Sequence, residues 1–582
     1  VGHEALKVAS TGIENVAVGC SAMIANTTGS YNTAVGGYGT LDANTTANNN
    51  TAIGAGVMTA NTTGANNTSV GAYSLDANTT ANSNTAVGYA SLSSNTTGTE
   101  NTAIGKDSLG ANTTANSNVA VGVESLQDNT TGASNTAVGT GSLKEQTTAS
   151  NNTAVGYHSL RENTTADHNT AVGYNALLAN TTGNTNTAIG SSALTANTTA
   201  SFNTGVGHSA LEANTTGASN TAVGKNSLAA NTTASNGTAI GRDALKANTT
   251  GDSNTAVGFD CLGANTTGTA NTAVGHNTLD ANTTANSNSA FGYNALTSNT
   301  TGTLNVAIGS ECMADNTTGS SLTAVGENAL HANTTASNNT AVGYNALLAN
   351  TTGSENQAFG TYTLATCSTG AYNTAVGYNG LGALTTGTNN VALGFRAGQG
   401  ITTGGRNTLI GEGSGIAGSP SGNITTGSNT MCLGDDNLGT LFCIQGTINT
   451  SDVRDKRNIT DFSNGLDWIN KMKPVTYQWD RRSWYVDEDA TPEDILAVKT
   501  DGSLTKPKVE VGLIAQDVLE IEKEHGFGSD NDNSLLVNLT EDETRYGINY
   551  TNIVPMLIKA VQELSTQVEE LKNNKCKCNK EK

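Results

Sequence analysis

Tryptophan, proline and positive charge are scarce in the first 450 residues of this 582-residue chain. That stretch has no Trp, one Pro (Pro420), and 9 Lys and Arg against 23 Asp and Glu. The last 132 residues hold all three Trp, four of the five Pro, and 18 basic and 25 acidic residues. A change this sharp indicates that two kinds of protein sequence meet near residue 450.

Other absences narrow the possible functions. The formal net charge is -21 and no basic cluster is present, which argues against nucleic-acid binding. No apolar run approaches the ~18 residues that span a bilayer, so we expect no membrane insertion. No signal peptide is visible, but the chain starts inside a repeat at Val1, and we expect an N-terminal part to be missing.

The eight cysteines are scattered and do not suggest a disulfide framework. Cys261 and Cys312 occupy a repeat position that otherwise holds Ala or Ser, which predicts small buried side chains. Cys576 and Cys578 form a C-K-C sequence in a Lys-rich tail, which is a weak metal site. The sequence therefore predicts no metal and no cofactor.

A 17-residue repeat dominates the chain. The glycine of an Asn-Thr-Ala-Val-Gly motif recurs 25 times between Gly2 and Gly411, at a spacing of 17 except for 18 between Gly36 and Gly54. A unit this short cannot bury an apolar face alone, whereas stacked copies can. The period predicts an all-β shaft over residues 1–415, folded as a parallel β-solenoid or β-roll.

Each repeat offers two strand candidates, one over Asn-Thr-Ala-Val-Gly and one around an Ala-Leu pair such as Ala176 and Leu177. Asn-Thr-Thr-Gly is typical of a turn. It is also formally a glycosylation sequon, and regular Thr arrays can bind ice, but we interpret these residues as turn chemistry. We expect Leu to form a thin core, and Asn at a fixed position to stack into a hydrogen-bonded ladder.

The Asn…Ala-Val/Ile-Gly core of the repeat resembles the head repeats of YadA-like trimeric adhesins. Those repeats are shorter and form a left-handed parallel β-roll in which three chains interlock. The resemblance covers residues 1 to about 415 and implies a homotrimer. The longer period here leaves the coil shape and its handedness open.

The period breaks after Gly411, and the next register glycine, Gly434, follows 23 residues later. About six residues are therefore inserted into one coil. We predict a neck over residues 416–450, with one last coil at 431–434 and a strand over 440–450.

Residues 451–582 show a mixed α/β pattern. We predict helices over 465–472, 516–524 and 552–572, and strands over 474–479, 509–514 and 535–539. In the last helix Val554, Leu557, Val561, Leu564, Val568 and Leu571 are spaced alternately by three and four. This heptad seam favours association between chains, although an amphipathic helix packed on its own domain remains an alternative. Val with Leu slightly favours two strands over three.

Three motifs follow one another in this segment. Ser451-Asp452-x-Arg454-x-Lys456-x-Asn458-Ile459 precedes G-L-I-A-Q-D-V from Gly512, and Y-x-x-I from Tyr550 comes last. With the terminal coiled coil, they resemble the endosialidase-type C-terminal intramolecular chaperone, a self-cleaving serine peptidase found at the end of phage tail fibres and tailspikes. The resemblance spans residues 451–582 and implies a domain that aligns the chains and then releases itself.

The motif chemistry fits self-cleavage. A Ser hydroxyl needs a base, and a Lys can serve if burial lowers its pKa from about 10.4 towards neutrality. The resemblance implies that Ser451 attacks the carbonyl of Thr450 and that Lys456 takes the proton. Asp452 and Arg454 would support the turn or pair across chains. A charged surface turn with a chance Ser and Lys is the alternative.

Together these observations predict a viral, phage-like tail-fibre protein: a trimeric β-solenoid shaft, a neck and a chaperone domain that cuts between Thr450 and Ser451. The only enzymatic activity expected is this single-turnover cleavage. We expect the virion as its location, a host-cell receptor or glycan as a partner, and other tail proteins bound through the missing N-terminal part. The alternative is a bacterial trimeric surface adhesin with a non-cleaving cap.

Overall fold

The computed structural model describes residues 1–435, 437, 456–486, 490–540 and 545–578, with the backbone alone for 576–578. The chain forms two compact units, Val1–Thr335 and Ala336–Lys582. Each unit is described separately below.

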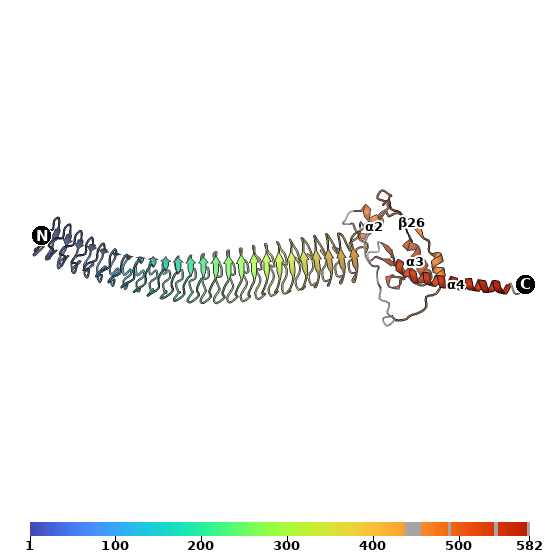
Figure 1. Cartoon of the computed structure of the whole chain (residues 1–582), viewed down its shortest axis with the longest axis horizontal. Coiled ribbons are helices and arrows are strands. Elements are labelled where there is room, and N and C mark those ends of the chain that lie inside the picture. The colour runs from blue at the N-terminus through green and yellow to red at the C-terminus, as the bar shows by residue number, and fades with distance from the viewer. Residues whose placement is uncertain (436, 438–455, 487–489, 541–544, 579–582) are drawn as a thin grey trace. The chain divides into compact units, whose positions relative to one another are not determined.

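The first unit is a parallel β-solenoid, in which each coil contributes one three-residue strand (Figure 1). Each strand pairs with the equivalent strand of the next coil, so that Thr170 lies opposite Thr187 and Ala171 opposite Ala188. The strands are Val16–Val18 (β1), Thr33–Val35 (β2), Thr51–Ile53 (β3), Thr68–Val70 (β4), Thr85–Val87 (β5), Thr102–Ile104 (β6), Val119–Val121 (β7), Thr136–Val138 (β8), Thr153–Val155 (β9), Thr170–Val172 (β10), Thr187–Ile189 (β11), Thr204–Val206 (β12), Thr221–Val223 (β13), Thr238–Ile240 (β14), Thr255–Val257 (β15), Thr272–Val274 (β16), Ser289–Phe291 (β17), Val306–Ile308 (β18) and Thr323–Val325 (β19). The predicted solenoid and its first strand are confirmed.

The second predicted strand, around the Ala-Leu pair, is wrong. Leu177 has a φ of 54° and Asn175, two residues earlier, a φ of 53°, which is the left-handed region rather than extended backbone. The segment therefore folds as consecutive turns. Neighbouring coils still bond there, because the Leu177 N–H donates to the Ala193 carbonyl at 2.9 Å. Leucine seldom adopts a left-handed conformation, so its type gave no sign of this turn.

Small apolar side chains and amides fill the coil interior. The central Ala of the strand and the Ala-Leu pair, such as Ala188, Ala193 and Leu194, are fully buried. The predicted Asn ladder is confirmed: Asn197 Nδ2 donates to Asn180 Oδ1 of the preceding coil at 2.8 Å. A second ladder runs beside it, in which the backbone N–H of Asn203 donates to Asn186 Oδ1 at 2.9 Å.

The register glycine is required by the spacing of the coils. Gly190 has a φ of 137°, and a Cβ built on it would lie 2.4 Å from the carbonyl oxygen of Gly207 in the next coil. The single 18-residue coil keeps its ladder, since Asn44 Nδ2 reaches Asn26 Oδ1 at 2.7 Å. The turn around Tyr38, whose side chain is 89% exposed, accommodates the longer spacing.

The second unit begins with further coils of the same kind. Their strands are Thr340–Val342 (β20), Gln357–Phe359 (β21), Thr374–Val376 (β22), Val391–Leu393 (β23), Thr408–Ile410 (β24) and Met431–Leu433 (β25). Thr408 lies opposite Met431, 23 residues later, so the predicted insertion and the predicted last coil are confirmed. The strand predicted over 440–450 lies outside the described residues.

The rest of the second unit is a small α/β module. Its helices are Gly465–Lys471 (α1), Pro492–Ala497 (α2), Ala515–Glu524 (α3) and Ile553–Cys578 (α4), its 3-10 turns are Arg482–Tyr485 (η2), Asn531–Asn533 (η3) and Tyr550–Asn552 (η4), and its strands are Val475–Tyr477 (β26), Glu510–Gly512 (β27), Val537–Leu539 (β28) and Tyr546–Ile548 (β29). Two antiparallel pairs form, β26 with β27 and β28 with β29. All six predicted elements are present, within a few residues of the expected bounds except at the longer C-terminal end of α4; α2 and β29 were missed.

The module core is built around Trp468. The residues buried with it are Val518, Leu536, Val537 and Met556.

Helix α2 starts at a capping box, in which the side chains of Thr491 and Asp494 each accept the other's backbone N–H. The sequence T-P-E-D is typical of such a helix start. Within the described residues, no helix is both long and apolar enough to cross a membrane.

Candidate functional site

The described part of the predicted cleavage site is small. Thr450, Ser451, Asp452 and Arg454 lie outside the described residues, so the geometry of the Ser–Lys pair stays a prediction. Lys456 is the first residue described after them, and it is exposed.

The last part of the same motif contains a left-handed turn. Asn458 has a φ of 52°, a conformation that Asn tolerates better than most residues. The Asn of the motif therefore has a backbone role close to the predicted base.

The two later motifs meet in space. Leu513 donates its backbone N–H to the Tyr550 hydroxyl at 2.8 Å, so a residue of Y-x-x-I holds the start of G-L-I-A-Q-D-V. Gly512 lies in the same contact: a Cβ there would be 2.8 Å from the Tyr550 hydroxyl and 3.0 Å from the Tyr477 ring. The motifs thus mark one packed junction between β26, β27 and η4.

A buried carboxylate fixes the loop after α3. Glu522 has no exposed surface, and its oxygens accept the backbone N–H of Leu535 at 2.7 Å and of Leu536 at 2.5 Å. The Ser534 hydroxyl donates to it at 2.9 Å. A buried carboxylate is tolerated when such donors surround it. Sequence reasoning missed Glu522, because its partners lie 12 to 14 residues away in an irregular segment.

The only histidine of the module, His525, packs against Trp468 and is hydrogen-bonded to Asp467. Its ring lies 4.4 Å from the ring of Trp468, and its Nε2 is 3.0 Å from Asp467 Oδ2. The hydrogen bond from Lys471, with a contribution from His525, holds the pKa of the Asp467 carboxyl below its usual value. These contacts join α1 to the end of α3.

Helix α4 presents two distinct faces. Ile553, Met556 and Ala560 are buried against the module. Glu563 belongs to the same face and accepts the backbone N–H of Leu466 at 2.9 Å, at the start of α1.

The heptad seam lies on the other face of α4. Leu557, Val561 and Leu564 are 43%, 64% and 49% exposed. The seam residues are therefore distinct from those that pack on the module, and the alternative that the seam itself packs on its own domain is not what this chain shows.

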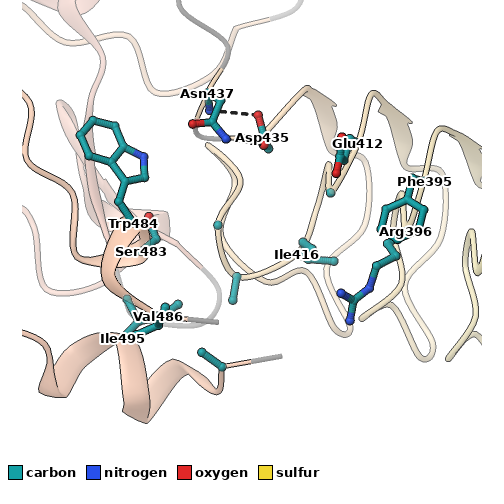
Figure 2. A pocket seen from close by; sticks show the side chains of 14 residues that line it. Phe395, Arg396, Glu412, Ile416, Asp435, Asn437, Ser483, Trp484, Val486 and Ile495 are labelled. Atoms are coloured by element: carbon teal, nitrogen blue, oxygen red, sulfur yellow. Dashed lines mark hydrogen bonds between the residues drawn. The ribbon is translucent and has the colours of Figure 1, made fainter. Parts of the chain in front are cut away.

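A pocket of about 180 Å³ lies within the second unit (Figure 2). Phe395, Arg396 and Glu412 of the last coils and Trp484 and Ile495 of the module line it. Its described lining contains the carboxylates of Glu412 and Asp435 but no Lys, His or Cys, and it includes none of the described residues of the predicted cleavage motif. We assign it no catalytic role.

The buried thiols of the coils are unreactive. Burial raises the pKa of the Cys261 and Cys312 thiols to about 12, which keeps them protonated and unreactive at neutral pH. This confirms their prediction as small buried residues.

Cys20 is exposed. Among the described residues, no group of three or more His, Cys, Asp or Glu is placed to hold a metal ion.

Part of the C-terminal module matches a known protein family. Residues 451–527 match the model of the family described as chaperone of endosialidase. The C-terminal segment is therefore similar to the endosialidase-type chaperones over these residues. The match begins at Ser451, covers α1 to α3 and ends just after His525, and it confirms the resemblance carried by the sequence motifs. No curated protein matches the chain.

Proposed function

We propose that this chain is a phage-type tail-fibre protein, with a solenoid shaft over residues 1–415, a neck over 416–450 and a chaperone domain over 451–582. The observation that carries the proposal is the order of parts: a long parallel β-solenoid followed by a segment that matches the chaperone of endosialidase. Its place would be an extracellular fibre on a virion, where it contacts a host-cell receptor or glycan.

The chaperone domain would bring three copies into register. Its helix α4 offers an exposed heptad seam that the module itself leaves uncovered. Parallel alignment of long repetitive chains is slow and prone to slipped registers, because every coil resembles its neighbours. A C-terminal domain that associates first would remove that ambiguity.

Release would follow by cleavage between Thr450 and Ser451. Ser451 Oγ would attack the Thr450 carbonyl while Lys456 takes the hydroxyl proton and passes it to the Ser451 amine, so that the peptide bond breaks and an ester joins Thr450 to Ser451. Water would then hydrolyse this ester, which frees the Thr450 carboxylate, restores the Ser451 hydroxyl and separates the two parts. A lysine base needs burial, and Lys456 is exposed in the single chain. We therefore expect cleavage only after copies have assembled. Loss of the domain would leave the fibre kinetically trapped.

The decisive experiment is the intact mass of the purified protein under denaturing conditions. We expect the 59.0 kDa chain to be cut between Thr450 and Ser451 in the wild type and in a Ser463→Ala control, but not in Ser451→Ala or Lys456→Ala. The uncut Ser451→Ala fibre should also unfold faster than the wild type. An uncut wild type would contradict self-processing and favour a non-cleaving cap, as in the adhesin alternative.

A further inference from the structure

The outward face of the sheet in the first unit carries no charge. The central residue of each three-residue strand points into the coil, so the first and third residues point outward. In β1 to β19 the third residue is always Val, Ile or Phe, and the first is Thr, Val or Ser. We call this surface the strand face.

The strand face is exposed along the coils. Seven of its third-position residues are between 39% and 42% exposed: Val18, Ile53, Ile104, Ile189, Ile240, Phe291 and Ile308. The third residues of the other strands are at least partly exposed, so a row of β-branched and aromatic side chains runs along the sheet, an unusual surface for a chain that remains alone in water.

The charges of the coils lie outside the strands, most of them in the turns around the Ala-Leu pair and a few, such as Glu100 and Asp167, in the turn before a strand. Lys144 pairs with Glu124 at 2.6 Å, and Lys246 pairs with Asp260 at 2.6 Å. All four residues belong to the turns around the Ala-Leu pair, not to a strand. The repeat thus separates a charged side from an uncharged one in coil after coil.

The exposed apolar area is large enough for a stable interface. A half-exposed Val or Ile leaves on the order of 50 Å² of apolar side chain accessible to water. Nineteen coils then offer roughly 1,000 Å² per copy, compared with about 800 Å² per partner in a standard interface. The area would suit a permanent contact rather than a passing one.

We propose that the strand face is the surface through which the shafts of neighbouring copies of this chain pack, in parallel and in register. This inference rests on the proposed function, because it names the contact surface of the oligomeric fibre. The occupant is a second copy for two reasons. Copies with a formal charge of -21 repel each other, so they must meet where charge is missing. Coils also repeat about every 4.8 Å, a spacing that another copy of the shaft matches along its whole length.

Register follows from the α4 seam. A parallel helical seam at the C-terminal end sets the same residue numbers side by side, and the coils then continue that alignment. Ile189 of one copy is therefore expected to face Ile189 of the next. Face-to-face sheets lie about 10 Å apart, within reach of a short bismaleimide.

The test compares Ile189→Cys with Thr199→Cys in the full-length protein. Both positions lie in one coil, but Thr199 is exposed in the Asn-Thr-Thr turn, outside the strand face. The background replaces by Ser the cysteines that are exposed or lie outside the described side chains: Cys20, Cys443, Cys576 and Cys578. We expect Ile189→Cys to give a cross-linked fraction several-fold higher than Thr199→Cys. Native mass is measured in parallel.

The outcomes distinguish failure of the proposed oligomeric fibre from failure of the strand-face contact. A native mass of a single chain would overturn both self-association and the strand-face contact. A native mass of three chains with equal cross-linking at both positions, or with none at Ile189, would overturn the strand face alone. As a second variant, Ile189→Lys should lower the temperature at which copies separate, whereas Thr199→Lys should not; equal shifts would also contradict the proposal.

Discussion

The coils and the C-terminal α/β module both bury polar side chains, but they distribute them differently. In the coils one amide contact is repeated, so Asn197 bonds Asn180 before it and Asn214 after it. In the module a single carboxylate, Glu522, holds several donors of one loop beside the Trp468 core. A solenoid is stabilised coil by coil, whereas a small domain unfolds as one unit. A destabilising substitution should therefore affect only the neighbouring coils in the solenoid, but the stability of the whole domain in the module.

The largest effect is expected at Glu522. Glu522→Ala leaves the buried N–H groups of Leu535 and Leu536 without their acceptor, which should cost about 3 kcal/mol or more of unfolding free energy. All three Trp lie after residue 450, so Trp fluorescence during denaturation reports the module alone. Glu522→Gln keeps an acceptor oxygen and should lose less. Equal losses in both variants would show that one retained acceptor oxygen is not enough to stabilise the loop.

A smaller and confined effect is expected in the coils. Asn197→Ala removes a fully buried amide that donates to Asn180 and to the Ala200 carbonyl, at a cost of about 1–3 kcal/mol. Amide hydrogen exchange should speed up in the adjacent coils, while Trp fluorescence melting stays unchanged. The matched control is Thr199→Ala, an exposed residue of the same turn. Faster exchange spread over the whole shaft would contradict nearest-neighbour stability.

Sequence periodicity predicted much of the coil, because a contact that recurs every 17 residues is visible as a pattern. The strand, the amide ladder and the inserted coil before Met431 were all found in this way. The turn at Leu177 was not predicted, because a Leu side chain gives no indication of a positive φ.

In the module the motifs located the junction around Gly512, but not its contacts. Tyr550 meets Leu513 across 37 positions, and Glu563 meets Leu466 across 97. Helix bounds follow from local periodicity, whereas such long-range pairs follow from the tertiary fold. The same limit applies to the predicted Ser–Lys pair, whose members must be brought together by packing.

The smallest effect is a difference in pH dependence. Hydrogen bonding from Lys471 lowers the pKa of Asp467, so its stabilising contribution is present above the unfolded-state pKa and is lost as pH falls through the lower folded-state value. In the coils, burial raises the pKa of Asp42, Asp76 and Asp280, so ionisation of these groups costs stability, and falling pH removes that cost.

Melts between about pH 6 and about pH 3 should therefore show the module weakening more than the solenoid, with Trp fluorescence following the module and far-UV circular dichroism the solenoid. Asp467→Asn should flatten the pH dependence of the module, and Asp532→Asn, an exposed residue of η3, should leave it unchanged. Parallel pH profiles in the two regions would contradict this prediction, because they would mean that acid changes the stability of the coils and of the module equally.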